Sequence, residues 1–121
     1  MAHILVVDDE LLIRQMLKRM LEMEGYEVTT ASNGNMAINL VREKHVDLVI
    51  TDVLMSEADG LELLMKMKKQ TCGIKIIAIS GGGRIGSQDC LKMARRIGAQ
   101  RVFPKPVARE EMLKAIKDLL G

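Results

Sequence analysis

Aromatic residues and cysteine are scarce in this chain of 121 residues, which contains no tryptophan, one tyrosine, one phenylalanine and two cysteines. With so few aromatic rings and ten methionines, the core is expected to consist of aliphatic and thioether side chains. Cys72 and Cys90 form no CxxC pair and have no histidine at zinc-ligand spacing. We interpret both as reduced, structural thiols of a cytosolic protein.

Long apolar segments and a large excess of one charge are also absent. The longest apolar runs span about seven residues, well short of the roughly 20 needed to cross a bilayer, and the N-terminus has no signal-peptide pattern. Eighteen basic and 16 acidic residues leave a net charge of +2, which does not by itself indicate nucleic-acid binding. The sequence therefore predicts a single cytoplasmic domain that binds neither membranes nor nucleic acid.

Apolar runs of strand length alternate with helical patterns five times along the chain. The expected strands are 3–9, 26–30, 46–52, 74–80 and 100–103. The expected helices are 11–25, 32–45, 59–71, 87–98 and 108–120. This alternation predicts an α/β fold, in which a doubly wound parallel sheet carries helices on both faces. Three of the strands are apolar throughout, as expected for strands buried on both faces.

Polar or charged residues follow or end four of the five expected strands. Asp8 and Asp9 end the first strand, Asp52 ends the third, Ser80 ends the fourth, and Lys105 comes just after the fifth. In open α/β sheets, ligands bind beyond the carboxyl ends of the strands. Crowded carboxylates require a cation, and Mg²⁺ suits carboxylates together with a phosphate. The alternative, that the first two aspartates only cap the next helix, explains neither Asp52 nor Lys105.

These features resemble the receiver domain of two-component response regulators. The similarity covers nearly the whole chain. It rests on the motifs VVDDE (6–10), DLVITDVLM (47–55), DG (59–60), IIAIS (76–80), GA (98–99) and PKP (104–106). The resemblance implies a flavodoxin-like (βα)5 fold with strand order 2-1-3-4-5. It also implies one receiver domain over residues 1–121, with no output domain in this chain.

The resemblance implies a chemistry in which Asp52 accepts a phosphoryl group with Mg²⁺. The donor would be a histidine kinase or histidine phosphotransfer protein, and the signal would pass to a downstream protein target. The implied metal ligands are Asp8, Asp9, Asp52 and the backbone carbonyl of Leu54. The implied phosphoryl-binding residues are Val53, Ser80, Gly81 and Lys105. The implied partner-docking residues are Leu11, Leu12, Pro106 and Val107. Such a domain catalyses only its own phosphotransfer and dephosphorylation, so it is a signalling module rather than an enzyme.

Three positions depart from the family's usual pattern. Ser56 stands where a proline is usual, and Gly81 stands where an alanine usually follows the serine. Val102 lies three residues before Lys105, where the family commonly has tyrosine or phenylalanine. Phe103 should face the opposite side of the strand. The aromatic signalling mechanism of the family is therefore not expected here.

The segment ISGGGRIGS (79–87) matches the dinucleotide-binding pattern G-x-G-x-x-G. That pattern belongs after the first strand of its unit, with an acid about 20 residues further on. Here it follows the fourth strand, and residues 101–103 contain no acid. We interpret the match as accidental and hypothesise that this loop carries the phosphorylation signal. A nucleotide- or flavin-binding enzyme and a phosphorylation-independent, receiver-like adaptor remain as alternatives.

Histidines and helix methionines complete the candidate residues. His3 and His45 are expected to be structural or surface residues. Met16, Met20 and Met23 lie near one stripe of the first helix, which favours core packing. The alternative is a soft docking surface that combines some of these methionines with Leu11 and Leu12.

Overall fold

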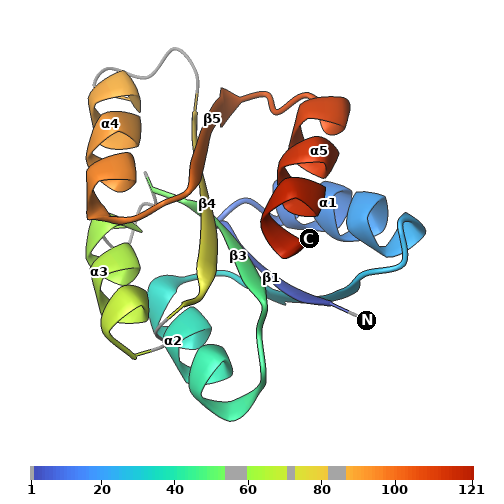
Figure 1. Ribbon diagram of the computed structural model, residues 1–121, viewed down its shortest axis with the longest axis horizontal. Coiled ribbons are helices and arrows are strands. Elements are labelled where there is room, and N and C mark those ends of the chain that lie inside the picture. Colours follow the sequence, from blue (N-terminus) through green and yellow to red (C-terminus); the bar gives the residue numbers. More distant parts are fainter. Residues whose placement is uncertain (1, 54–59, 71–72, 82–86) are drawn as a thin grey trace.

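A five-stranded parallel sheet lies between two layers of helices in this computed structural model, which describes residues 2–53, 60–70, 73–81 and 87–121 (Figure 1). The strands are β1 (His3–Val7), β2 (Glu27–Ala31), β3 (Leu48–Asp52), β4 (Lys75–Gly81) and β5 (Arg101–Lys105). The helices are α1 (Leu11–Met23), α2 (Gly34–Glu43), α3 (Gly60–Gln70), α4 (Ser87–Ile97) and α5 (Arg109–Leu120).

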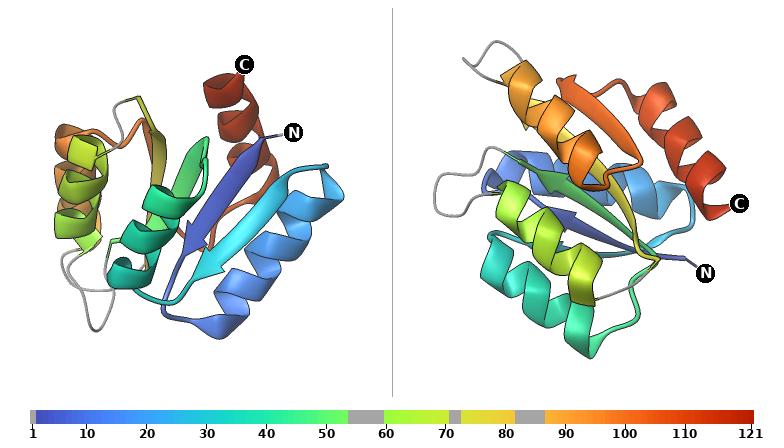
Figure 2. Two further views of the ribbon diagram at one scale, coloured as in Figure 1. Left: turned by 90° about the horizontal axis from the view of Figure 1, so that it is seen from below. Right: turned by 60° about the vertical axis from the view of Figure 1, so that its left-hand side comes forward.

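The order of the strands is β2-β1-β3-β4-β5, and all four neighbouring pairs are parallel (Figure 2). Both findings confirm the doubly wound α/β fold and the strand order predicted from the sequence. Helices α1 and α5 cover one face of the sheet, and α2, α3 and α4 cover the other (Figure 1). Within the described residues, no helix is long and apolar enough to cross a membrane.

The ends of the elements differ from the predicted ends by a residue or two, for local chemical reasons. Helix α1 ends before Gly25, whose φ of +91° is readily adopted only by glycine. Helix α2 begins after Asn33, because its side chain accepts a hydrogen bond of 2.9 Å from the backbone N–H of Met36. Strand β5 continues through Pro104, which an edge strand tolerates because it lacks a second neighbour.

Side chains of each buried strand alternate between two separate cores. In β1, Ile4 and Val6 pack with residues of α1 and α5, whereas Leu5 and Val7 pack with residues of α2, α3 and α4. All four are fully buried. Burying each such side chain contributes roughly 1.5–3 kcal/mol. The continuous apolar pattern of the central strands thus fills both cores, as predicted.

The methionines contribute less to these cores than predicted. Met16 and Met23 are 51% and 68% exposed, and Met20 is only partly buried. The side of α1 that faces the sheet is formed by Leu17 and Leu21, which are fully buried. The prediction of core packing is therefore wrong for Met16 and Met23. Among the described residues, the fully buried methionines are Met67 and Met112.

Both histidines belong to a hydrogen-bonded group at the N-terminal end of β1. The ring of His3 lies 2.9 Å from the carbonyl oxygen of His45 and 2.7 Å from the hydroxyl of Thr29. The backbone N–H of His3 donates to Asp47 Oδ2 at 2.8 Å, and His45 Nε2 lies 2.9 Å from Asp47 Oδ1. His3 is buried and His45 is exposed, which confirms their prediction as structural and surface residues.

This hydrogen-bonded group makes the stability of the fold depend on the charge of Asp47. The backbone N–H of His3 lowers the pKa of the Asp47 carboxyl against the opposing effect of burial, and His45 lowers it further. A depressed pKa stabilises the fold fully above about pH 3.9, the unfolded-state value, and this stability is lost as the pH falls through the folded-state pKa. Asp47→Asn should therefore lower the free energy of unfolding by about 1 kcal/mol at neutral pH.

Urea unfolding at neutral and strongly acidic pH measures this effect. The loss in the free energy of unfolding caused by Asp47→Asn should be smaller at strongly acidic pH, because the wild-type Asp47 carboxyl is also neutral there. Glu43→Gln, at the exposed end of α2, removes the same charge as a control and should change little. An equal loss at both pH values would show that the carboxylate charge of Asp47 is not responsible.

Candidate functional site

The sheet brings chemically active side chains together at the C-terminal edge of β1, β3 and β5. Strands β1 and β3 run in register, with Val7 opposite Thr51. Asp8 directly follows β1, Asp52 is the last residue of β3, and Lys105 is the last residue of β5. Asp8 and Asp52 are almost completely buried, at 0% and 1% exposure. Two buried carboxylates therefore lie at one edge of the sheet, as the positions of the strand ends predicted.

Lys105 lies at the centre of this edge and contacts three carboxylates. Its Nζ is 2.8 Å from Asp8 Oδ2, 2.9 Å from Asp52 Oδ2 and 3.2 Å from Glu10 Oε1. Burial disfavours the charged ammonium, but the hydrogen bonds and negative charges of Asp8 and Asp52 outweigh burial and raise the pKa of Lys105. The lysine is therefore a permanent positive charge held against the carboxylates. The Lys105–Pro106 peptide bond is cis.

Four carboxylates converge on the space beside this lysine. Asp8, Asp9, Glu10 and Asp52 each offer an oxygen atom, and these atoms lie within 4.8 Å of one another. One ammonium cannot neutralise four negative charges, so the group favours a hard divalent cation with oxygen ligands. The residues present therefore fit Mg²⁺. Three of the four carboxylates were predicted as ligands, whereas Glu10 was not, although it directly follows the aspartate pair.

Burial makes the Asp8 carboxyl a weaker acid than an aspartate in water. Removal from water raises the pKa of the Asp8 carboxyl, although Lys105 and the backbone N–H of Glu10, 2.9 Å from Oδ1, oppose this shift. A raised folded-state pKa favours the fold below the unfolded-state value of about 3.9, and this contribution is lost as the pH rises through the folded-state pKa. At neutral pH, ionised Asp8 therefore reduces the stability of the metal-free protein.

The variant Asp8→Asn should therefore raise the melting temperature of the metal-free protein at neutral pH. Asparagine keeps an acceptor oxygen for the Glu10 N–H and leaves Lys105 its contacts with Asp52 and Glu10. Each kcal/mol gained corresponds to roughly 4 °C in a domain of this size. Thermal unfolding with EDTA and with Mg²⁺ measures the change, and the variant should lose most of the Mg²⁺-induced stabilisation. A lower melting temperature in EDTA would contradict the proposed cost of burying the Asp8 carboxylate.

Ser80 offers a hydroxyl without a partner close to this edge. It is fully buried, and among the described residues its Oγ has no hydrogen-bond partner. An unsatisfied buried hydroxyl costs about 1–3 kcal/mol, which favours a ligand that accepts its hydrogen bond. Strand β4 places Gly81, the next residue, opposite Lys105 in β5. The structure thus brings Ser80, Gly81 and Lys105 to neighbouring strand ends.

Other predicted site residues differ in how far the structure describes them. The backbone N–H of Val53 donates to the Ile79 carbonyl at 3.0 Å. Contact between this N–H and a phosphoryl group requires that bond to open, so its role stays a prediction. The Leu54 carbonyl, Ser56 and Cys72 lie outside the described residues. So does the part of the glycine loop at 82–86, on which the loop hypothesis depends.

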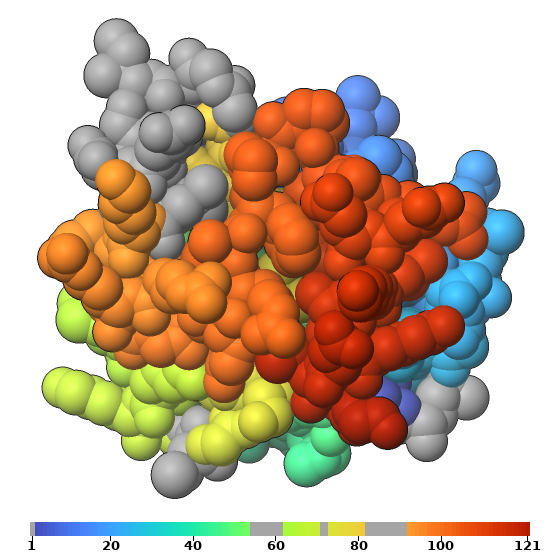
Figure 3. Space-filling model, turned by 45° about the horizontal axis from the view of Figure 1, so that its top comes forward, coloured from blue at the N-terminus to red at the C-terminus, as the bar shows by residue number. Residues whose placement is uncertain are grey.

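The two residues before the β5 proline face opposite cores, as predicted. Val102 packs against the core shared with α2, α3 and α4, whereas Phe103 packs against the core shared with α1 and α5. Figure 3 shows α4, β5 and α5 side by side on one face of the molecule. The side of β5 on which the family resemblance implies an aromatic residue thus carries a valine in this chain.

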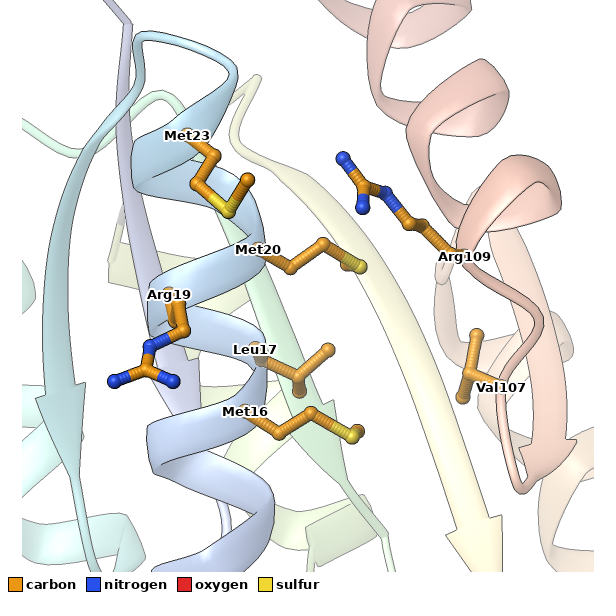
Figure 4. A pocket seen from close by; sticks show the side chains of 7 residues that line it. All are labelled: Met16, Leu17, Arg19, Met20, Met23, Val107 and Arg109. Carbon is orange, nitrogen blue, oxygen red and sulfur yellow. The ribbon is translucent and has the colours of Figure 1, made fainter.

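An apolar groove lies between α1 and the segment that leads from β5 into α5 (Figure 4). Its volume is about 460 Å³. The residues that line it are Met16, Leu17, Arg19, Met20, Met23, Val107 and Arg109. Leu11 and Leu12, at the start of the same helix, are 56% and 77% exposed, and Pro106 is exposed as well. Of the predicted docking residues, Leu11, Leu12 and Pro106 are therefore accessible, whereas Val107 is half-buried and lines the groove, and their role in docking stays a prediction.

These observations define a doubly wound α/β domain with an acidic, cation-binding type of site around one lysine. The model of the response regulator receiver domain matches residues 4–117, and the chain belongs to this family. The standard function of the family is to accept a phosphoryl group, and its members are generally signalling domains. Response regulators interact with histidine kinases and downstream targets. The match favours the receiver interpretation over a dinucleotide site.

Relatives with known names support this assignment. The chain is 33% identical over 117 residues to sporulation initiation phosphotransferase F of Bacillus subtilis. This match covers 97% of this chain and 92% of that protein. It is 34% identical over 119 residues to the transcriptional regulatory protein GlrR of Escherichia coli. That match covers 98% of this chain but only 26% of GlrR. The chain thus spans most of one relative and about a quarter of the other.

Solved structures show the same fold. A response regulator receiver domain protein from Clostridium thermocellum has a TM-score of 0.90 at 34% identity, covering 99% of this chain and 94% of that chain. The response regulator TrrA from Thermotoga maritima, in complex with Mg²⁺-BeF, has a TM-score of 0.85 at 34% identity. The latter match covers 98% of this chain and 99% of that chain.

Proposed function

We propose that Asp52 is the phosphoacceptor of this receiver domain and that Mg²⁺ binds beside it. The observation that supports this role is the position of Asp52, a buried carboxylate at the end of a central strand, with Oδ2 2.9 Å from Lys105 Nζ. Asp8, Asp9 and Asp52 would hold the ion together with the Leu54 carbonyl. The Mg²⁺–BeF complex of the relative TrrA also favours this role.

In the proposed reaction, an oxygen of Asp52 attacks the phosphorus atom of a phosphohistidine on the partner. The bond from phosphorus to the histidine nitrogen breaks, and an aspartyl phosphate forms. Lys105 balances the charge on the transferring oxygens, while the Ser80 hydroxyl and the Gly81 N–H supply hydrogen bonds. Bound Mg²⁺ would neutralise part of the carboxylate and phosphoryl charge. The chain would catalyse this transfer and its own dephosphorylation, and no other reaction.

The donor in this proposal is a histidine kinase or a histidine phosphotransfer protein. The exposed side chains of Leu11, Leu12 and Pro106, together with the half-buried Val107 of the apolar groove, would form its docking surface. Apolar side chains that are accessible beside a polar site are typical of protein interaction surfaces, and thioethers adapt to different partners. The name of the Bacillus subtilis relative, a phosphotransferase, agrees with a role in phosphoryl transfer between proteins.

Titration of the isotope-labelled protein with Mg²⁺ and then beryllofluoride tests the proposal by NMR. Beryllofluoride mimics a phosphoryl group on a carboxylate, so the amide signals of Val53, Ser80 and Gly81 should shift only when Mg²⁺ is present. A phosphorylation-independent adaptor would give no such shifts. Titration with NAD(P) or FMN should leave the spectrum unchanged, since a nucleotide-binding enzyme would respond to one of them.

A further inference from the structure

We propose that Glu10 competes with the phosphoryl group for Lys105 and thereby weakens the binding of a phosphoryl group at Asp52. In the structure the Glu10 carboxylate occupies one of the lysine's three N–H donors, and a phosphoryl oxygen would take its place. The inference rests on the proposed roles of Asp52 and Lys105. It adds a residue whose contact with Lys105 competes with the contact between Lys105 and the phosphoryl group.

Three carboxylates surround Lys105, and two of them, Glu10 and Asp52, accept hydrogen bonds from its Nζ. An ammonium group carries three N–H donors, and Nζ has three carboxylate oxygens within 3.2 Å, one each from Asp8, Glu10 and Asp52. The lysine side chain is only 12% exposed, so water has limited access to it. A phosphoryl oxygen therefore has to compete with these carboxylates for contact with Lys105.

Glu10 is the carboxylate that withdraws most easily. The side chains of Asp8 and Asp52 are 0% and 2% exposed, whereas that of Glu10 is 52% exposed. Asp8 is held further by the backbone N–H of Glu10, and Arg14 donates to the Asp8 carbonyl oxygen. The Glu10 contact is also the longest of the three, at 3.2 Å. Its carboxylate can return to water at little cost.

The direction of the Glu10 side chain also favours this role. Glu10 is the N-cap residue of α1, where a side chain often accepts a hydrogen bond from the first turn of the helix. The Glu10 side chain makes no such cap bond. It points instead to Lys105, which lies 95 residues away in the sequence. The residue thus gives up a local capping contact and binds the lysine of the site.

Two substitutions separate contact with Lys105 from a general effect of charge. Glu10→Gln removes the negative charge, and Glu10→Asp keeps the charge but shortens the side chain so that it no longer reaches Lys105 in the same way. Both should tighten beryllofluoride binding at saturating Mg²⁺ by roughly two- to fivefold, the size of one half-exposed ion pair. Glu43→Gln, a removal of the same charge at the end of α2, should leave the affinity unchanged.

Isothermal titration calorimetry measures both affinities, first for Mg²⁺ alone and then for beryllofluoride with Mg²⁺ saturating. If Glu10 were instead a metal ligand or a support for Lys105, its variants would bind beryllofluoride more weakly, which would overturn the inference. Unchanged affinity in both variants would overturn it as well. If only Glu10→Gln bound beryllofluoride more tightly, the effect would come from the lost negative charge and not from competition for Lys105, and the inference would be wrong. Failure of the wild-type chain to bind beryllofluoride would instead disprove the proposed function.

Discussion

Asp52→Asn should abolish Mg²⁺-dependent phosphorylation by acetyl phosphate, with a loss of at least about 100-fold, or roughly 2.7 kcal/mol in the barrier. The reaction needs a carboxylate oxygen that attacks phosphorus, and an amide of the same size cannot form the aspartyl phosphate. Lys105 would keep its contacts with Asp8 and Glu10, so the fold should survive. Mass spectrometry of the intact protein measures the fraction phosphorylated.

Asp47→Asn is the matched control for this experiment. It makes the same chemical change in a carboxylate at the opposite end of the sheet, where Asp47 bonds His3 and His45. This control should be phosphorylated like the wild type, although it is less stable. If Asp52→Asn were still phosphorylated, the acceptor would be another carboxylate of the cluster, and peptide mapping would then identify it.

Lys105→Met should destabilise the metal-free protein at neutral pH by about 3–5 kcal/mol, because it leaves buried carboxylates without their counter-ion. Methionine keeps most of the apolar stem, so the change removes mainly the ammonium. Mg²⁺ should restore much of the loss, since a ligand at about 100 times its dissociation constant contributes roughly 2.7 kcal/mol. Urea unfolding in EDTA and in Mg²⁺ gives both values.

The pH dependence of the Lys105→Met effect follows from Asp8. Without the lysine, burial would raise the pKa of the Asp8 carboxyl still further. The neutral form would then persist to higher pH, and stability would be lost as the pH rises through that value. The difference in the free energy of unfolding between Lys105→Met and the wild type should therefore become smaller toward pH 4. Lys114→Met, at an exposed position of α5, is the control, and a similar loss in both variants would contradict the pairing argument.

The fold was predictable because the buried strands are short, uninterrupted runs of apolar residues in the sequence. Residues 4–7 and 48–50 are apolar on both sides, which only a sheet covered on both faces allows. Much of the site was predictable for a related reason. The carboxyl ends of parallel strands meet at one edge, so Asp8, Asp52 and Lys105 had to lie close together once their strands were assigned.

Glu10 was not predictable in the same way, because its contact depends on distant structure. From the sequence, Glu10 is simply the residue before a helix, where a carboxylate favours the helix N-terminus. Its contact with Lys105 exists because β5 ends beside the first loop, although the two residues are 95 positions apart. No local pattern contains that information.

The exposure of Met16 and Met23 was missed because helical spacing does not tell which apolar residues reach the sheet. Several apolar side chains of α1 share one broad side, but only Leu17 and Leu21 are fully buried against the sheet, and Met20 is partly buried. The neighbouring helix α5 does not close over the remainder, which leaves the groove bordered by Val107. The position of α5 therefore determines how far Met16 and Met23 are exposed.

The acidic edge also concentrates negative charge at one place on the molecule. The four carboxylates of the cluster and Lys105 together carry an excess of three negative charges. Because the whole chain has a net charge of +2, the rest of it carries a net charge of +5. A charged partner will therefore turn the domain before contact, with a positive surface drawn to the acidic edge and a negative surface drawn elsewhere. The rate of association should then fall steeply as salt shortens the range of these forces to about 10 Å at 0.1 M.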